Sequence, residues 1–133
     1  MNRKGFALIL SMVMALAIGA SALYLYSSVN LDMMISGNKR RTTQAKISAA
    51  SGLNHFSALN LNYTTLREQA GDLQTLRIIP EMQLGDMTSY EVNVHFCCRL
   101  SDGQYIVESI GYYKKRNKIL SQYPIRALYQ GSE

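Results

Sequence analysis

The feature that most constrains this chain is an uninterrupted apolar stretch near its N-terminus. From Phe6 to Leu31 the sequence runs for 26 residues without Asp, Glu, Lys or Arg. A bilayer core of roughly 30 Å needs about 20 apolar residues in helical form, so this stretch is long enough to cross a membrane. The chain has 133 residues, of which 47% are hydrophobic. This length suits one membrane segment and one small domain.

A cleaved secretion signal is the first alternative for the same stretch. Such a signal has an apolar region of about 7–15 residues, followed by small residues at the cleavage site. Ala20 and Ala22 resemble a cleavage site, but Leu23, Tyr24 and Leu25 continue the apolar run past them. The sequence therefore favours a helix that is retained.

Beyond the apolar stretch, one set of residues keeps a helical spacing. Positions 31, 35, 38, 42, 45, 49, 52, 56 and 59 advance by steps of four and three, which is the spacing of one helix face. This pattern predicts that the helix continues to about residue 59. The small residues Ala45, Ala49 and Gly52 on this face would let a sheet or another helix approach closely. Gly37 and Asn38 are weak helix formers where a bend is also compatible with the pattern.

The C-terminal part of the chain carries strand signals. Apolar and polar residues alternate from 90 to 100, which predicts a strand with one buried face. An Asp-Gly turn at 101–104 and a second turn at 115–118 then separate two further strands. Residues 60–89 are expected to form a connecting region with a short helix around 65–70. Pro124 cannot donate to a strand ladder, so the last strand is expected at an edge or with a bulge.

These elements predict an α+β fold. A long N-terminal helix would span the membrane with its first half and pack with its second half on a small antiparallel β-sheet, a meander over residues 90–130. The N-terminal residues also resemble a type IV prepilin leader, in which a short basic segment ends in glycine and phenylalanine follows, as do Lys4, Gly5 and Phe6 here. The segment 31–53, LDMMISGNKRRTTQAKISAASGL, resembles the region after the membrane helix in minor pilins of the PilX type.

The resemblance implies a processing step and a set of partners. A prepilin peptidase would cut between Gly5 and Phe6, and the new amino group of Phe6 would be methylated. Because this peptidase acts at the cytoplasmic face, the resemblance implies an N-in orientation, which the cations at both ends of the apolar run leave open. The expected domains are a leader at 1–5, a membrane and filament-core helix at 6–31 and a periplasmic pilin-like domain at 32–133. The expected partners are pilin and minor pilin subunits, the prepilin peptidase and the inner-membrane assembly platform.

One position departs from the pilin pattern. Most pilins have glutamate at the fifth residue after the cut, where this chain has Leu10. A carboxylate in hydrocarbon is costly, and in the family it is thought to pair with the terminal amine of a neighbour during assembly. Its absence resembles PilX-type and tip-type subunits and indicates a minor pilin, first in the bacterial inner membrane and then in a filament on the cell surface. Together with Leu10, the small residues Gly19, Ala20 and Ser21 are expected to pack against neighbouring helices.

Little in the sequence points to catalysis. No phosphate loop, paired-carboxylate signature or nucleophile elbow is present in the sequence, so no enzyme, cofactor or metal site is expected. Cys97 and Cys98 are adjacent, and a bond between them would distort a strand, so Cys98 is most simply a core residue. A metal site from Cys97 and His95 would lack two further ligands. His55 is expected to pack or to lie at the surface.

Basic residues gather in two places in the sequence. The first group follows the apolar stretch and would contact lipid phosphates before assembly: Lys39, Arg40 and Arg41. The second is a turn that is expected to be solvated, with a contact to DNA or to an acidic neighbour as the alternative: Lys115 and Arg116, flanked by Lys114 and Lys118. The net charge of +5 includes two leader cations and is too mild to favour nucleic acid.

Two other functions share many of these features. A minor pseudopilin of a type II secretion system would have the same leader, helix and small sheet. A single-pass anchored periplasmic binding module would have the anchor and the sheet, and it predicts no cut at Gly5.

Overall fold

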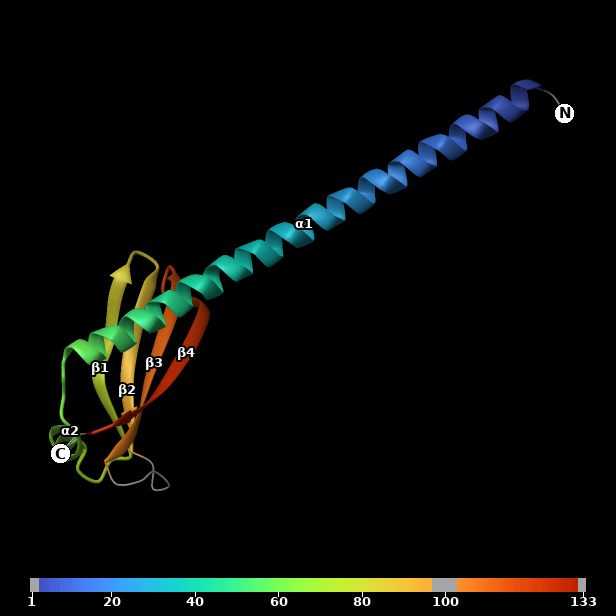
Figure 1. Ribbon diagram of the computed structural model, residues 1–133. Coiled ribbons are helices and arrows are strands. Elements are labelled where there is room, and N and C mark those ends of the chain that lie inside the picture. The colour runs from blue at the N-terminus through green and yellow to red at the C-terminus, as the bar shows by residue number, and fades with distance from the viewer. Residues whose placement is uncertain (1–2, 97–102, 132–133) are drawn as a thin grey trace. The chain divides into compact units, whose positions relative to one another are not determined.

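The computed structural model describes residues 3–96 and 103–131 (Figure 1). It contains two helices, α1 (Arg3–Ala58) and α2 (Tyr63–Ala70). Four strands follow: β1 (Thr75–Gly85), β2 (Thr88–His95), β3 (Gln104–Lys115) and β4 (Lys118–Gln130). The chain divides into two compact units, Met1–Asn38 and Lys39–Glu133, which we call the apolar unit and the globular unit. The fold is the α+β arrangement that the sequence predicts, with α1 packed on a four-stranded antiparallel sheet.

The C-terminal half of α1 lies across one face of the sheet in the globular unit (Figure 1). Its buried side follows the predicted spacing, because Ala45, Ala49, Gly52 and Phe56 are all buried. The helix continues through Gly37 and Asn38 and ends at Ala58. The spacing of small and apolar residues in the sequence thus identifies the face of α1 that meets the sheet.

The sheet is a meander with the strand order β1-β2-β3-β4. Along β2 the alternation is as predicted, with Tyr90, Val92 and Val94 buried toward α1. The β3–β4 turn has Arg116 and Asn117 at φ values of 51° and 64°, the two positive values that a tight type I′ hairpin turn requires. β4 is an edge strand, so Pro124 lies where a missing backbone donor costs little.

The short helix expected around residues 65–70 is confirmed as α2, but the expectation that the rest of residues 60–89 only connects the helix to the sheet is wrong. This segment holds α2 and the 11-residue strand β1, which pairs with β2 along the other edge of the sheet. The pairing shifts register between Arg77 and Ile79 and again between Ile79 and Met82. These irregularities surround Pro80 and interrupt the period-two alternation, which is why the sequence pattern does not reveal the strand.

A single hydrophobic core joins α1, α2 and the sheet. Leu66 of α2 is fully buried in it, and ring contacts connect Phe56 of α1 to Tyr105 of β3 and Tyr129 of β4. The rings of Tyr105 and Tyr129 stack with centroids 5.7 Å apart. The buried members are Phe56, Leu66, Ala70, Ile79, Tyr90, Val92, Val94, Phe96, Tyr105 and Val107.

The contact between α1 and the sheet, which we call the seam, has a second end beyond the aromatic cluster. There α1 approaches the sheet backbone directly. Gly111 of β3 lies under the helix so closely that a Cβ atom there would be 2.0 Å from the carbonyl oxygen of Ala45 and 2.4 Å from the amide nitrogen of Ala49. Small residues therefore face each other at this end, and large aromatic residues fill the other end. The difference in side-chain size between the two ends determines how closely α1 packs on β3 at each end.

Candidate functional site

The apolar unit is one candidate functional element. Within the described residues, one helix is long and apolar enough to cross a membrane, and its most apolar part is not buried in the protein. Phe6 is 55% exposed and Leu16 is 73% exposed. Apolar surface of this extent requires lipid or other apolar helices around it.

The residues expected at the leader and in helix packing all lie on α1. Gly5, Phe6, Leu10, Gly19, Ala20 and Ser21 are exposed within the apolar unit. A Cβ atom at Gly5 or Gly19 would meet nothing within 4 Å. Ser21 donates its hydroxyl to the carbonyl of Ala17 at 2.8 Å, so this polar group is satisfied inside the helix. The small residues at 19–21 can therefore pack against a neighbouring helix without leaving the Ser21 hydroxyl unpaired.

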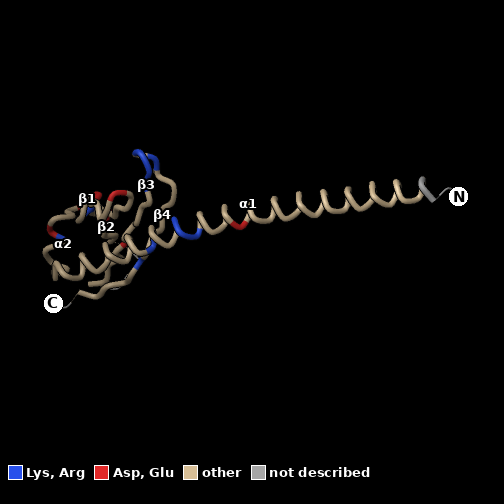
Figure 2. The backbone as a smooth tube through the Cα atoms, turned by 90° about the horizontal axis from the view of Figure 1, so that it is seen from above, with Lys and Arg blue, Asp and Glu red and all other residues tan. Residues whose placement is uncertain are grey.

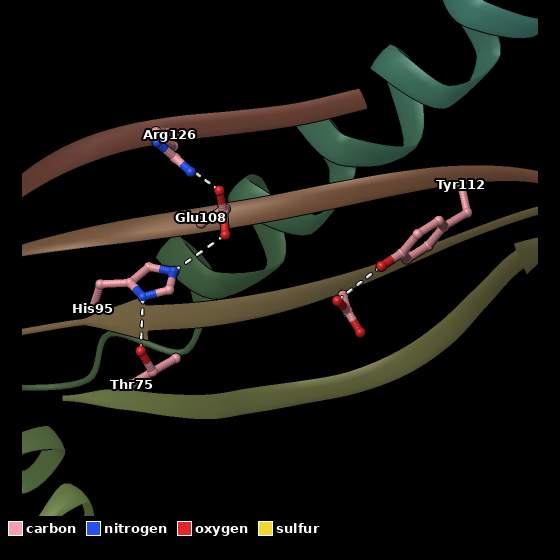
Figure 3. Close-up of polar contacts among 6 residues, drawn as sticks. Thr75, His95, Glu108, Tyr112 and Arg126 are labelled. Carbon is pink, nitrogen blue, oxygen red and sulfur yellow. Dashed lines mark hydrogen bonds and ion pairs between the residues drawn. The ribbon is translucent and has the colours of Figure 1, made fainter. Parts of the chain in front are cut away.

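A second candidate is the face of the sheet turned away from α1, which we call the open face. Figure 3 shows a row of side chains that crosses all four strands: Thr75, His95, Glu108 and Arg126. The Thr75 hydroxyl lies 2.9 Å from Nδ1 of His95, and Nε2 of His95 lies 3.2 Å from a Glu108 carboxylate oxygen. Arg126 donates from Nε to the other Glu108 oxygen at 2.7 Å. We call these four residues the polar row.

Glu108 is the centre of the polar row, because it is a carboxylate with only 8% of its surface exposed. Burial would raise the pKa of Glu108, but the hydrogen bonds from Arg126 and His95 outweigh it and hold this pKa below its ordinary value of 4.5. An ionised carboxylate only accepts hydrogen bonds, so Nε2 of His95 carries a proton here. The Thr75 hydroxyl contacts the other ring nitrogen, Nδ1.

The other carboxylates of the open face are compensated in the same way. Glu91 accepts a hydrogen bond from the Tyr112 hydroxyl at 2.8 Å and pairs with Arg77 at 3.5 Å. Burial, followed by the bond to Glu91, raises the pKa of Tyr112. Glu81 pairs with Lys114, which lowers the pKa of Glu81. These are cross-strand pairs that fix the register of the meander.

The chemistry of the open face is that of a structural network. Each of its carboxylates is matched by a cation or by hydrogen-bond donors, and among residues 3–96 and 103–131 no group of three His, Cys, Asp or Glu side chains is placed to hold a metal ion. The polar row was not predicted from the sequence. The alternation of polar residues along residues 91–95 was its one visible signal, and alternation does not say which residues pair across strands.

We predict that Glu108→Gln lowers the free energy of unfolding of the globular unit by about 1–3 kcal/mol at pH 7, because Arg126 and His95 lose a buried carboxylate. The pKa of Glu108 is lower in the folded chain than in the unfolded chain, so its contribution is present above the unfolded pKa and is lost as the pH falls through the folded pKa. The difference from the native chain should therefore shrink in acid.

The measurement is urea unfolding of the full chain in mild detergent, followed by near-ultraviolet circular dichroism of the tyrosines at pH 7 and in acid. Glu68→Gln is the control, because Glu68 is an exposed carboxylate on α2. A stability gap for Glu108→Gln that stays constant across this pH range would contradict the assigned role.

The remaining residues singled out in the sequence have local explanations or lie outside the described residues. Nδ1 of His55 lies 2.8 Å from the Tyr90 hydroxyl, which is a packing role. Cys97 and Cys98 are outside the described residues. Lys39, Arg40, Arg41, Lys115 and Arg116 are exposed in the globular unit. Comparisons of the chain with protein-family models, with curated proteins and with solved structures found no match.

Proposed function

We propose that this chain is a minor pilin, a low-copy subunit that takes part in assembly or initiation of a type IV pilus and is anchored in the bacterial inner membrane before incorporation. The observation that carries the proposal is the composition of α1. One helix, Arg3–Ala58, contains both the exposed apolar surface of the apolar unit and the buried seam of the globular unit.

The exposed apolar surface of this helix explains why such a chain would join a filament. The apolar unit is stable in lipid, and it leaves lipid only if other apolar helices replace the surrounding chains. Subunits with similar helices supply such a surface in a filament. The patch Gly19, Ala20 and Ser21 supports close packing there, because no bulky side chain holds a neighbouring helix away.

The test of the proposal is the leader. We predict that the mature chain begins at methylated Phe6 and that Gly5→Val leaves the precursor uncut, because the branched side chain keeps the protease from approaching the backbone closely. The measurement is the intact mass of the protein from cells with and without prepilin peptidase. Gly37→Ala is the matched glycine control, since a Cβ atom there meets nothing within 4 Å and the position is far along the chain from the cut.

Each outcome of this test assigns the chain to one function. A precursor that keeps residues 1–5 in cells with active peptidase would refute the proposal and favour an anchored periplasmic module. A chain that is cut, is absent from pili and is required for protein secretion would instead be a pseudopilin.

A further inference from the structure

The two basic clusters of the sequence lie toward the same end of the globular unit. Thr42 of α1 lies 3.5 Å from Ser121 of β4, oxygen to oxygen. Ser121 lies four residues after Asn117 of the β3–β4 turn, and Thr42 follows Arg41 directly. Figure 2 shows the basic residues on α1 and those of the turn beside β3 and β4. We call this region the basic end; its exposed cations are Lys39, Arg40, Arg41, Lys115, Arg116 and Lys118.

The charge of the basic end is largely uncompensated, in contrast to the open face. Lys114 is paired with Glu81. The β1–β2 turn brings Asp86 to the same end, because the amide of Lys114 donates to the carbonyl of Met87 at 2.7 Å. The basic end therefore has six exposed cations near two carboxylates, Glu81 and Asp86. A positive surface of this kind attracts a polyanion.

Along the chain, the first cation of the basic end lies close to the stretch that would cross the membrane. Only the seven residues Asp32–Asn38 separate the apolar stretch ending at Leu31 from Lys39. We infer that the basic end docks on the phosphates of anionic lipids in the leaflet where the apolar helix emerges. This inference rests on the membrane-anchoring part of the proposed function and is independent of its filament part.

Lipid is favoured over nucleic acid for two reasons. The tether holds the basic end at high effective concentration beside the bilayer, which a freely diffusing polyanion lacks. Each Lys or Arg near an anionic leaflet contributes about 1 kcal/mol, or roughly a fivefold factor in binding, so a few tethered cations suffice. The net charge of +5 is small for a domain that must capture DNA from solution.

The test uses the full chain in lipid nanodiscs with a single fluorescent probe. The chain contains no Trp, so Tyr113→Trp, at a half-buried position on β3 two residues before Lys115, gives one emission signal beside the turn. Discs of phosphatidylcholine carry a lipid whose head group bears a spin-label quencher, with or without phosphatidylglycerol. We expect strong quenching only with phosphatidylglycerol, and we expect high salt to reverse it.

Charge variants locate the contact. Lys115→Gln, Arg116→Gln and Lys118→Gln combined should lower the ratio of docked to undocked chain about 100-fold, from the fivefold factor for each charge. For single changes, Arg116→Gln should lower this ratio about fivefold. Arg67→Gln, on α2 against the Phe96 ring at the other end of the sheet, should leave it unchanged.

Three results would overturn the inference: equal quenching in both kinds of disc, equal losses from Arg116→Gln and Arg67→Gln, or no loss in the triple variant. A DNA duplex that removes the quenching in phosphatidylglycerol discs at physiological salt would assign the basic end to nucleic acid instead. Copurification of the chain with the discs reports anchoring separately, and the cut at Gly5 reports the pilin assignment, so each failure is distinguishable.

Discussion

Gly111→Ala should lower the free energy of unfolding of the globular unit by at least about 3 kcal/mol, the upper range for overpacking a core. The new Cβ atom would lie 2.0 Å from the carbonyl oxygen of Ala45 and 2.4 Å from the amide nitrogen of Ala49. Both are backbone atoms of α1, so no side-chain rotation relieves the contact. The helix must move off β3, which opens the seam along its length. A domain of ordinary stability, about 5–15 kcal/mol, would lose a large fraction of its margin.

Two glycines of α1, Gly52 and Gly37, make this prediction for Gly111 of β3 specific. Gly52→Ala would contact the Ser109 hydroxyl at 2.3 Å and the Tyr90 ring at 2.8 Å, and since these are side chains, we expect a smaller loss than for Gly111→Ala. Gly37→Ala meets nothing within 4 Å and should be neutral or stabilising, because Ala is the better helix former. Thermal unfolding of the full chain in detergent ranks the three variants. A midpoint for Gly111→Ala equal to that of the native chain would show that α1 does not rest on β3 at this point.

The helix seam was predictable from the sequence because it depends on local spacing alone. Ala45, Ala49, Gly52 and Phe56 recur at the helical period, and period and burial coincide in the structure. The β3–β4 turn was predictable for a similar reason, since the polar residues at Arg116 and Asn117 interrupt two β-rich segments. Neither feature needs knowledge of distant parts of the chain.

The features that were missed depend on which strands meet. β1 is an edge strand whose bulges around Pro80 remove the alternation that would identify it. Nothing in the sequence distinguishes Glu108 from an ordinary surface carboxylate. His95 and Arg126 contact it only because β3 pairs with β2 and β4. Likewise the basic end joins residues about 75 positions apart in the chain, and their proximity comes from the contact of Thr42 with Ser121.

The second large effect concerns the number of filaments. If this chain is a low-copy initiating or tip subunit, its deletion should sharply reduce the number of pili, while purified pili contain it at a few per cent or less. The reason lies at Leu10, which is 47% exposed on α1 and which, under the proposed cut after Gly5, takes the position where most pilins have glutamate. A shaft subunit would use that carboxylate to pair with the terminal amine of its neighbour. A leucine provides no such directional contact, so repeated addition of this subunit is disfavoured, whereas a single copy at the start of a fibre is not.

If the proposed function holds, Leu10→Glu should raise the share of this subunit in the shaft, because it places a carboxylate where the resemblance to pilins implies the terminal amine of a neighbour. Ile9→Glu is the matched control: Ile9 is 62% exposed on the same helix, so the cost of burying the charge in hydrocarbon is similar but no amine is placed to meet it, and incorporation should fall. Quantitative mass spectrometry of sheared filaments measures both shares against the native chain. A native share close to that of the most abundant pilin would end the minor-subunit assignment, and normal piliation after deletion, with no copy of the chain in the filaments, would leave the membrane anchor without a filament role.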